Sequence, residues 1–433
     1  MAVNIQDKIA EELTGMPAVN HHEHAWRSFS QQEIVVYDLP FYLCSGHVSW
    51  DMAAAGFREE PGMFDYLKTP RNSWRDGPEQ AWKKILPFLA KVRNGAYFRH
   101  LATGLDELFS VSEEDIFSDR WREASEKIYE SSLRHRGIGA AISRRLQIVA
   151  TVLDAKFEPP ELPKFETEGH LIVHVARMDP FIHEERGLAE VLEKYRPRDF
   201  EQWLATFEDV FQKSVENGAR GFKCALAYNR RIEFSNPAKD EAARIFEGGV
   251  LKASSAQKTL YQDFMVNCLC RLCVKAGAPL QIHAGIQGGT GHLLEEARPT
   301  LLAGLLRRHG DLRVDLSHGG YPWYAEAGLM AKYFPNVHIN GCWLSHISPS
   351  AYRAALTSWI ETVPMSKIFA WGGDSTLLEH SWASLALAKN LAGEVLADFV
   401  KREYFDLELA IEVAHRIFHA NGEEFWGLGA SQR

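Results

Sequence analysis

Short and nearly continuous apolar runs recur along the chain, and longer amphipathic segments separate them. The runs are rich in β-branched residues, as at 146–154 (LQIVATVLD) and 171–177 (LIVHVAR). Strands of parallel sheets are buried on both faces and show this pattern. The runs predict eight strands, at 16–22, 146–154, 171–177, 219–226, 278–283, 312–318, 336–340 and 366–374. Their alternation with helix-length segments predicts an α/β protein, a (β/α)8 TIM barrel.

The long segment between the first and second predicted strands departs from this pattern. Residues 27–145 are rich in aromatic residues and carry helical periodicity, for example at 79–89 and 119–129. A connection between strand and helix in a barrel is far shorter than this. We therefore predict an inserted helical subdomain at 27–145 over the barrel mouth, a barrel built from 1–26 and 146–433, and C-terminal helices from about residue 379 onward.

Composition and charge narrow the class of protein and its partners. The chain has 433 residues, of which 46% are hydrophobic and 24% charged, and a formal net charge of −9. This charge disfavours nucleic acid and anionic membranes as partners, so we expect a small-molecule substrate. No apolar run reaches transmembrane length, and the first 15 residues lack the apolar core of a signal peptide. Together with six cysteines in no compact framework, this predicts a cytoplasmic protein. Base rates favour a homo-oligomer.

Three of the cysteines cluster in one predicted helix. Cys268, Cys270 and Cys273 could suggest a zinc or redox site, but no second cysteine pair accompanies them. The apolar periodicity of the surrounding segment instead predicts that they pack in the core.

Potential metal ligands stand at or just past the ends of several predicted strands. His22 and His24 alternate along the first strand, so both point to one side of it. His283, His318 and Asp374 end later strands. Because the carboxyl ends of successive barrel strands meet at one mouth, these side chains predict a metal site. Imidazoles and a carboxylate suit Zn²⁺, and also Mn²⁺, Fe²⁺ or Ni²⁺.

Asp374, His318 and Lys223 are predicted to have different roles. Asp374 is predicted to bind metal and to take the proton of an attacking water; the alternative is an N-cap on the following helix. His318 is a second catalytic candidate, as a ligand or as a hydrogen-bonding electrophile. Lys223 ends the fourth strand, and a buried lysine with a lowered pKa can become a bridging carbamate. Its alternative is a salt-bridged or substrate-binding lysine.

Candidate substrate groups follow the third and fourth strands. Arg177, Tyr228, Arg230 and Arg231 should project into the same mouth, where an arginine fork would bind a substrate carboxylate. For each arginine the alternative is a structural ion pair. Asp179 is expected to stabilise its loop.

The ligand set resembles that of the amidohydrolase superfamily. The resemblance rests on His22, His24, Lys223, His283, His318 and Asp374 in their strand order. Segments 175–180 (VARMDP) and 221–230 (GFKCALAYNR) are similar to the amidohydrolase 2 branch, and the long insertion, with 97–109 within it, resembles that of uronate isomerase. Two residues depart from these patterns. Asn20 stands where the branch usually has an aspartate, and Lys223 is not a feature of uronate isomerases.

The resemblance implies a metal-activated reaction at a carbonyl-like centre. We expect a hydrolase that uses one or two Zn²⁺ ions, with Lys223 as a candidate for carboxylation. It would cleave an amide, lactam or lactone, through a C–N or C–O bond, in a small carboxylate-bearing substrate. The alternatives are a uronate isomerase-like aldose–ketose isomerase, a mononuclear metal-dependent decarboxylase, and a metal-free barrel that serves as a binding module.

Overall fold

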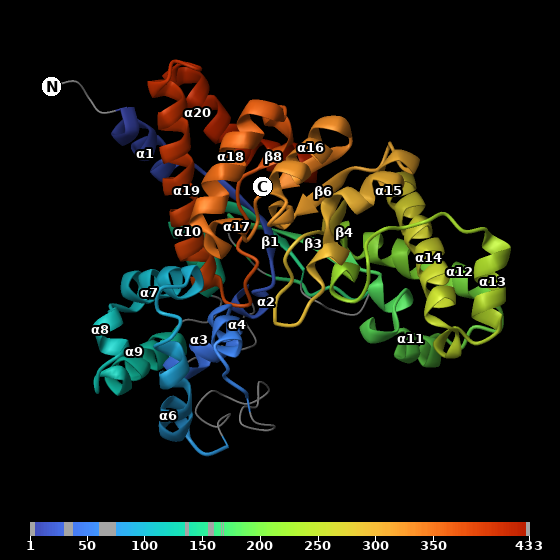
Figure 1. The fold of residues 1–433 in the computed structure, drawn as a ribbon, viewed down its shortest axis with the longest axis horizontal. Helices are drawn as coiled ribbons and strands as arrows, with labels where there is room; N and C mark the ends of the chain where they lie inside the picture. The colour runs from blue at the N-terminus through green and yellow to red at the C-terminus, as the bar shows by residue number, and fades with distance from the viewer. Residues whose placement is uncertain are drawn as a thin grey trace.

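Eight parallel strands form one sheet in which each strand pairs with the next along the chain. The computed structural model describes residues 5–29, 38–59, 75–134, 138–154, 160–165, 167 and 169–429. The strand order runs from β1 to β8 without a crossover, and Figure 1 shows helices around the sheet. The strands are β1 (Ala18–Glu23), β2 (Ile148–Leu153), β3 (Leu171–Arg177), β4 (Ala219–Cys224), β5 (Leu280–His283), β6 (Val314–Ser317), β7 (Val337–Asn340) and β8 (Ile368–Phe369). The predicted α/β barrel is confirmed.

The sheet curves into a nearly closed barrel, and the backbone after β8 completes the turn. β8 has two residues, whereas the sequence predicted a strand over 366–374. Beyond it the Asp374 amide donates to the His22 carbonyl (2.9 Å) and the His21 amide to the Trp371 carbonyl (3.4 Å). The last predicted strand is therefore mostly a loop that lies against β1, and this loop carries the aspartate predicted as a ligand.

Helices between and after the strands cover the outside of the barrel. They are α11 (Leu188–Tyr195), α12 (Phe200–Glu216), α13 (Lys239–Glu247), α14 (Ser255–Ala276), α15 (Ala303–Arg308), α16 (Tyr324–Tyr333), α17 (Leu344–Ile347), α18 (Pro349–Thr362), α19 (Leu378–Lys401), α20 (Leu407–His415) and α21 (Asn421–Trp426), with α1 (Ile5–Gly15) against α19 and α20. Cys270 and Cys273 of α14 are fully buried in the main core, and Cys268 packs against it. This confirms the prediction that the three cysteines pack in the core. None of the described helices is long and apolar enough to cross a membrane.

The segment between β1 and β2 contributes a separate group of helices. They are α2 (Trp26–Phe29), α3 (Leu39–Ser45), α4 (Val48–Ala54), α6 (Pro78–Leu89), α7 (Ala96–Phe109), α8 (Glu113–Ile116), α9 (Trp121–Arg134) and α10 (Ile138–Arg145). Figure 1 shows α3, α4 and α6–α9 on one side of the barrel, away from α11–α14. Their apolar cluster includes Cys342, Trp343 and Leu377, which follow β7 and β8. The inserted helices thus pack against loops at the carboxyl ends of the strands. The exact domain limits at 26/27 and 145/146 stay a prediction.

Candidate active site

The histidines of β1 point to both sides of the strand as alternation requires. His22 and His24 face the inside of the barrel mouth, with ring centroids 4.8 Å apart. His21 faces the other way and stacks on Phe369 at 4.0 Å. The pair predicted to grip a metal therefore lies on one side.

Hydrogen bonds determine which ring nitrogen of each histidine is free for a metal. His24 Nδ1 lies 2.7 Å from the Asp154 carbonyl oxygen, which can only accept, so Nδ1 carries the proton. His22 Nδ1 lies 2.6 Å from Gln281 Oε1. The Gln281 amide has one orientation, because its Nε2 donates to the His21 carbonyl (2.9 Å) and to Asp315 Oδ2 (2.7 Å). In its neutral form each histidine therefore carries its proton on Nδ1 and presents Nε2 as the donor to a metal.

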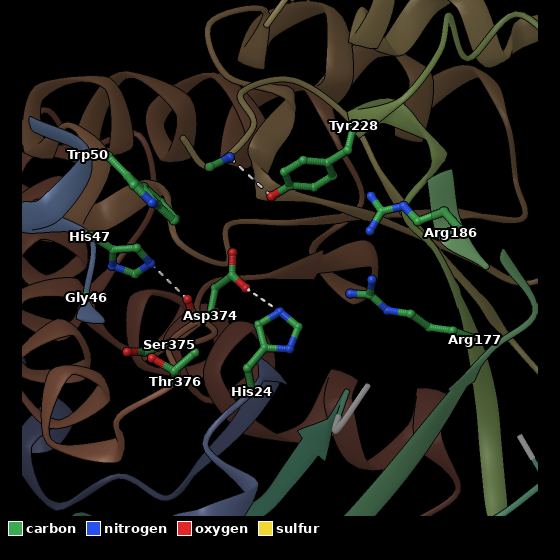
Figure 2. Close-up of a pocket in the computed structure, with 11 residues that line it drawn as sticks. His24, Gly46, His47, Trp50, Arg177, Arg186, Tyr228, Asp374, Ser375 and Thr376 are labelled. Atoms are coloured by element: carbon green, nitrogen blue, oxygen red, sulfur yellow. Dashed lines mark hydrogen bonds and ion pairs between the residues drawn. The ribbon is translucent and has the colours of Figure 1, made fainter. Parts of the chain in front are cut away.

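Asp374 completes a set of three donor atoms. Its Oδ1 lies 3.3 Å from His22 Nε2 and 3.3 Å from His24 Nε2, and Figure 2 shows the contact with His24. Metal–nitrogen distances of about 2.0–2.1 Å and tetrahedral angles place neighbouring donors about 3.3 Å apart. Both distances therefore match the separation of two donors that bind one metal ion.

The loop that carries Asp374 is clamped onto β1. The Gly373 amide donates to Asn20 Oδ1 (2.9 Å), and the Ser375 amide donates to Glu23 Oε1 (2.7 Å). A Cβ at Gly373 would overlap with Glu23 and Ser381, which is why this position needs glycine. Asp374 itself has a φ of 46°. The helix after the loop begins at Leu378 with Leu377 as its N-cap, so the alternative role of Asp374 as an N-cap is excluded.

The electrostatics of this group favour a neutral His22 and an ionised Asp374. Burial, with the charge of Lys223 as a second cause, lowers the pKa of His22 well below its usual value. Burial alone would raise the pKa of Asp374, but the three neighbouring histidines hold it well below its usual range. Neutral imidazoles and an ionised carboxylate are the states that bind a metal cation.

His318 lies on the other side of the Asp374 carboxylate. Its Nδ1 is 3.5 Å from Asp374 Oδ2, and burial lowers its pKa to about 3. Cys342, which the sequence reading missed, is close enough to His318 and Asp374 to form a second candidate group of ligand atoms. Burial raises the pKa of the Cys342 thiol well above its usual value.

His283 and Lys223 lie near this group, but they do not contact Asp374 Oδ1, the oxygen that faces His22 and His24. His283 Nε2 lies 2.8 Å from the Ile286 carbonyl oxygen, and its ring lies between those of His318 (4.2 Å) and Tyr228 (4.7 Å). Lys223 Nζ is 3.4 Å from Ser317 Oγ and, among the described residues, has no carboxylate as an ion-pair partner. Burial lowers its pKa. Their predicted roles as ligands stay predictions.

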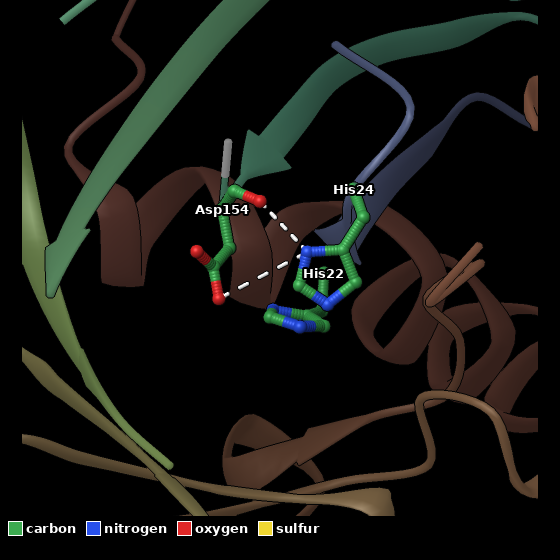
Figure 3. A group of neighbouring side chains, drawn as sticks. All are labelled: His22, His24 and Asp154. Atoms are coloured by element: carbon green, nitrogen blue, oxygen red, sulfur yellow. Dashed lines mark hydrogen bonds and ion pairs between the residues drawn. The ribbon is translucent and has the colours of Figure 1, made fainter. Parts of the chain in front are cut away.

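Asp154 supports the site from behind. It lies close enough to His22 and His24 to form a candidate ligand group with them. Its carboxylate, however, is on the Nδ1 side of His24 (Figure 3), 4.0 Å from that protonated nitrogen. Arg177 Nε also donates to both carboxylate oxygens, at 3.0 and 2.8 Å. We therefore regard Asp154 as an orienting residue and not as a ligand.

A cavity of about 210 Å³ opens above the donor group. Figure 2 shows His24 and Asp374 at its floor, Trp50 and His47 on one side, and Arg177 and Arg186 on the other. Tyr228 also lines it, so two of the four predicted substrate residues face the cavity. This volume suits a small ligand.

The other two predicted substrate residues do not line this cavity. Arg230 Nη2 pairs with Asp263 Oδ1 at 2.6 Å, and both side chains are buried. Arg231 Nε pairs with Glu233 Oε2 at 2.7 Å on the surface. The short helix Leu226–Tyr228 turns the chain after β4 and directs both side chains to these partners.

Several residues of the site were not anticipated, and some had a signal. Asp154 follows β2 as a polar residue at the carboxyl end of a strand, and Gln281 alternates with His283 on β5. The rule that found the ligands could have found these two. Arg186, His47 and Trp50 come from loops and the insertion, where no local pattern marks them.

Comparison with known proteins places this arrangement in a family. The sequence profile described as "Amidohydrolase" matches residues 207–428, about half of the chain. The chain belongs to the amidohydrolase family. Enzymes of this family typically bind divalent metal ions, which agrees with the donor group of His22, His24 and Asp374. The chain is also 27% identical over 223 residues to protein fluG of Emericella nidulans; the match covers 48% of this chain and 25% of that protein.

Solved structures share the fold over nearly the whole amidohydrolase chain. A putative metal-dependent hydrolase from Lactobacillus casei has a TM-score of 0.68 and 19% identity, covering 98% of this chain and 99% of the other. A uronate isomerase from Thermotoga maritima has a TM-score of 0.77 at 15% identity, covering 98% and 97%. A glucuronate isomerase from Caulobacter crescentus has a TM-score of 0.75 at 16% identity, covering 98% and 94%. At these identities the likeness shows the fold alone.

Proposed function

We propose that the protein is a metal-dependent hydrolase that cleaves an amide, lactam or lactone in a small carboxylate-bearing substrate. The observation that carries the proposal is the placement of His22 Nε2 and His24 Nε2, each 3.3 Å from Asp374 Oδ1. With both Nδ1 atoms engaged elsewhere, these are the donors that a metal would meet. Zn²⁺ suits this set best, and Mn²⁺, Fe²⁺ or Ni²⁺ would also fit.

The two oxygens of Asp374 have different surroundings, and this supports a double role. A divalent cation held by the three donors would lower the pKa of a water molecule and polarise a substrate carbonyl. Oδ1 faces the two Nε2 atoms, whereas Oδ2 faces His318. We assign to Oδ2 the transfer of the water proton to the leaving nitrogen or oxygen. We assign to His318, neutral and buried, the stabilisation of charge on the carbonyl oxygen.

The number of metal ions depends on Lys223. A buried lysine without an acidic partner and with a lowered pKa is the kind of amine that can take up carbon dioxide. A carbamate there would add an oxygen donor near His283 and His318 for a second ion. Without it, the proposal needs one ion only.

Elemental analysis of the protein purified without chelator tests the centre. The wild type and Lys223→Ala should be measured in parallel, as metal per chain. Two ions that fall to one or none in the variant would establish a lysine-dependent second site. One ion in both would leave Lys223 outside the metal centre. A wild type that binds none of the four candidate metals on reconstitution would contradict the proposal.

A substrate screen tests the reaction itself. N-acyl amino acids, lactam carboxylates and sugar-acid lactones would be offered to the metal-loaded enzyme in ¹⁸O-labelled water. Hydrolysis should place one labelled oxygen in the newly formed carboxylate. Turnover of a compound in the screen without incorporation of labelled oxygen would contradict a hydrolase.

A second candidate is aldose–ketose isomerisation of a sugar acid. The observation in its favour is that His47 and Trp50, both from the insertion, line the same cavity as Asp374. A polar cavity of this kind could enclose an open-chain sugar over one metal. Glucuronate and galacturonate in deuterated water, followed by NMR, distinguish the two reactions, because an isomerase yields the keto-acid with deuterium on carbon.

A further inference from the structure

Two guanidinium groups face the cavity, and they differ in how their charge is neutralised. Both point inward from the side opposite Trp50 and His47 (Figure 2). Arg177 is paired with the buried carboxylate of Asp154 through two of its nitrogens. Its positive charge is therefore already matched within the protein.

Arg186 has no such ion-pair partner among the described residues, although the buried carboxylate of Asp179 interacts with its charge from a greater distance. Its Nε donates to Asn229 Oδ1 (2.5 Å) and its Nη2 to the Ala225 carbonyl (3.0 Å), and both acceptors are neutral. Among the described residues, no carboxylate forms an ion pair with it. A half-buried guanidinium without a contacting carboxylate favours the binding of an anion, and a carboxylate matches its planar geometry.

The side chain of Arg186 is also held in place before any ligand binds. Asn229 Nδ2 donates to Glu185 Oε2 (2.7 Å), which orients the Asn229 oxygen toward Arg186. The Arg186 Cζ atom lies 5.3 Å from the centroid of the Tyr228 ring. With Nε and Nη2 engaged, Nη1 remains for a ligand. Such an arrangement lowers the entropy lost on binding.

Tyr228, whose ring Arg186 faces, adds a second donor to the same cavity. Its hydroxyl oxygen accepts from the Gly288 amide at 3.2 Å, so its own hydrogen is free to be donated. Of the described residues that line the cavity, Asp374 is the one carboxylate, and it belongs to the metal donors. Asp179 interacts with the charges of Arg177 and Arg186 but does not line the cavity, so no other lining carboxylate competes with a ligand for Arg186.

We propose that Arg186 and the Tyr228 hydroxyl form the subsite that binds the substrate carboxylate. The reacting carbonyl would then lie at the other end of the cavity, beside His24 and Asp374. This inference deepens the proposed function. It rests on that function only for placing the reacting carbonyl at the end of the cavity beside His24 and Asp374. The subsite would select small acids in which the carboxylate and the scissile carbonyl are separate groups. The cavity of about 210 Å³ limits their size.

Calorimetric binding of simple acids to the metal-reconstituted protein tests the subsite without any turnover. The probes are succinate, glutarate and adipate, each compared with the monocarboxylate of the same chain length, namely butyrate, valerate and hexanoate. One carboxylate can reach the metal and the second can reach Arg186. We expect at least one diacid to bind more tightly than its monoacid, and Arg186→Met to weaken that diacid about 10- to 100-fold.

Control variants separate the subsite from general effects. Monoacid binding should be unchanged in Arg186→Met, and Arg231→Met, an exposed arginine outside the cavity, should bind both acids like the wild type. Arg186→Lys, which keeps the charge and loses the fork, should show an intermediate loss and serves if the methionine variant does not fold. A diacid preference that survives both Arg186 variants, or no preference at any length, would overturn the subsite. Failure of the hydrolase proposal would appear in the substrate screen instead, with these affinities unaffected.

Discussion

Gln281 Oε1 lies 2.6 Å from His22 Nδ1, and this contact determines the proton position on the histidine. The other end of the amide is occupied by the His21 carbonyl and the Asp315 carboxylate, so Gln281 cannot present its nitrogen to His22. A side chain outside the donor group thus makes His22 Nε2 available to a metal. Such outer contacts fix the tautomer and the orientation of a ligand ring and so affect metal affinity.

Replacing Gln281 with leucine should weaken metal binding without removing a ligand. Because His22 would lose the acceptor that holds its ring and tautomer, we expect metal affinity to fall about 10- to 100-fold. Competition with a chelator of known affinity measures it. Gln212→Leu, an exposed glutamine on α12, is the matched control and should have wild-type affinity. Equal affinities in the two variants would show that the Gln281 contact has no bearing on the site.

Asp374→Asn should abolish turnover while the protein remains folded. The amide binds a cation poorly and cannot take the water proton, so kcat should fall by at least about 10²–10⁴-fold. Circular dichroism and metal analysis accompany the rate measurement. Asp311→Asn, at an exposed position before β6, should behave as wild type. A variant with near-full activity would remove Asp374 from the reaction.

Arg177→Met should destabilise the protein, and more strongly at high pH than at low pH. The charge of Arg177 outweighs burial and holds the pKa of Asp154 below its usual value. The stabilisation from this pair is thus present above the unfolded pKa of aspartate and lost as the pH falls through the folded pKa. Removing one partner of a buried pair costs about 3–5 kcal/mol.

In the Arg177 variant the sign of this pH dependence reverses. Burial then raises the pKa of Asp154 above its unfolded value, so the variant gains stability as the pH is lowered. Urea denaturation of both proteins at pH 5 and pH 8 should show the larger deficit at pH 8. A deficit that is the same at both values would mean that Asp154 does not titrate in the variant.

Gly288→Ala should disturb the contact between the barrel and the insertion. A Cβ on Gly288 would lie 2.5 Å from Cη2 of Trp50, which the inserted helix α4 carries. We expect a loss of about 1–3 kcal/mol in unfolding free energy. In a Trp50→Ala background the same substitution should cost little, because the methyl group would then have space. Gly15→Ala, where nothing lies within 4 Å, is the control. Additive losses in the double variant would exclude the contact as the cause.

The metal donors could be predicted because strand geometry is local. Alternation alone places His22 and His24 on one side of β1, and parallel strands bring their carboxyl ends to one mouth. The same rule found Asp374, although β8 ends five residues earlier and a loop delivers the carboxylate. It did not anticipate the partner of Arg230, because position after a strand does not determine where a long side chain goes once the chain has turned. Asp263, on α14, determines that instead.

By itself, the sequence determined the barrel, the inserted helices and the residues able to bind a metal, because hydrophobic periodicity and ligand chemistry are properties of short segments. Tertiary structure decided which atoms face one another. It bound Asp154 to Arg177, left Arg186 with neutral partners, and brought His47 and Trp50 from the insertion to the cavity. Each of these contacts joins segments far apart in the chain, and their distances depend on how the packed elements meet. No local pattern encodes such distances.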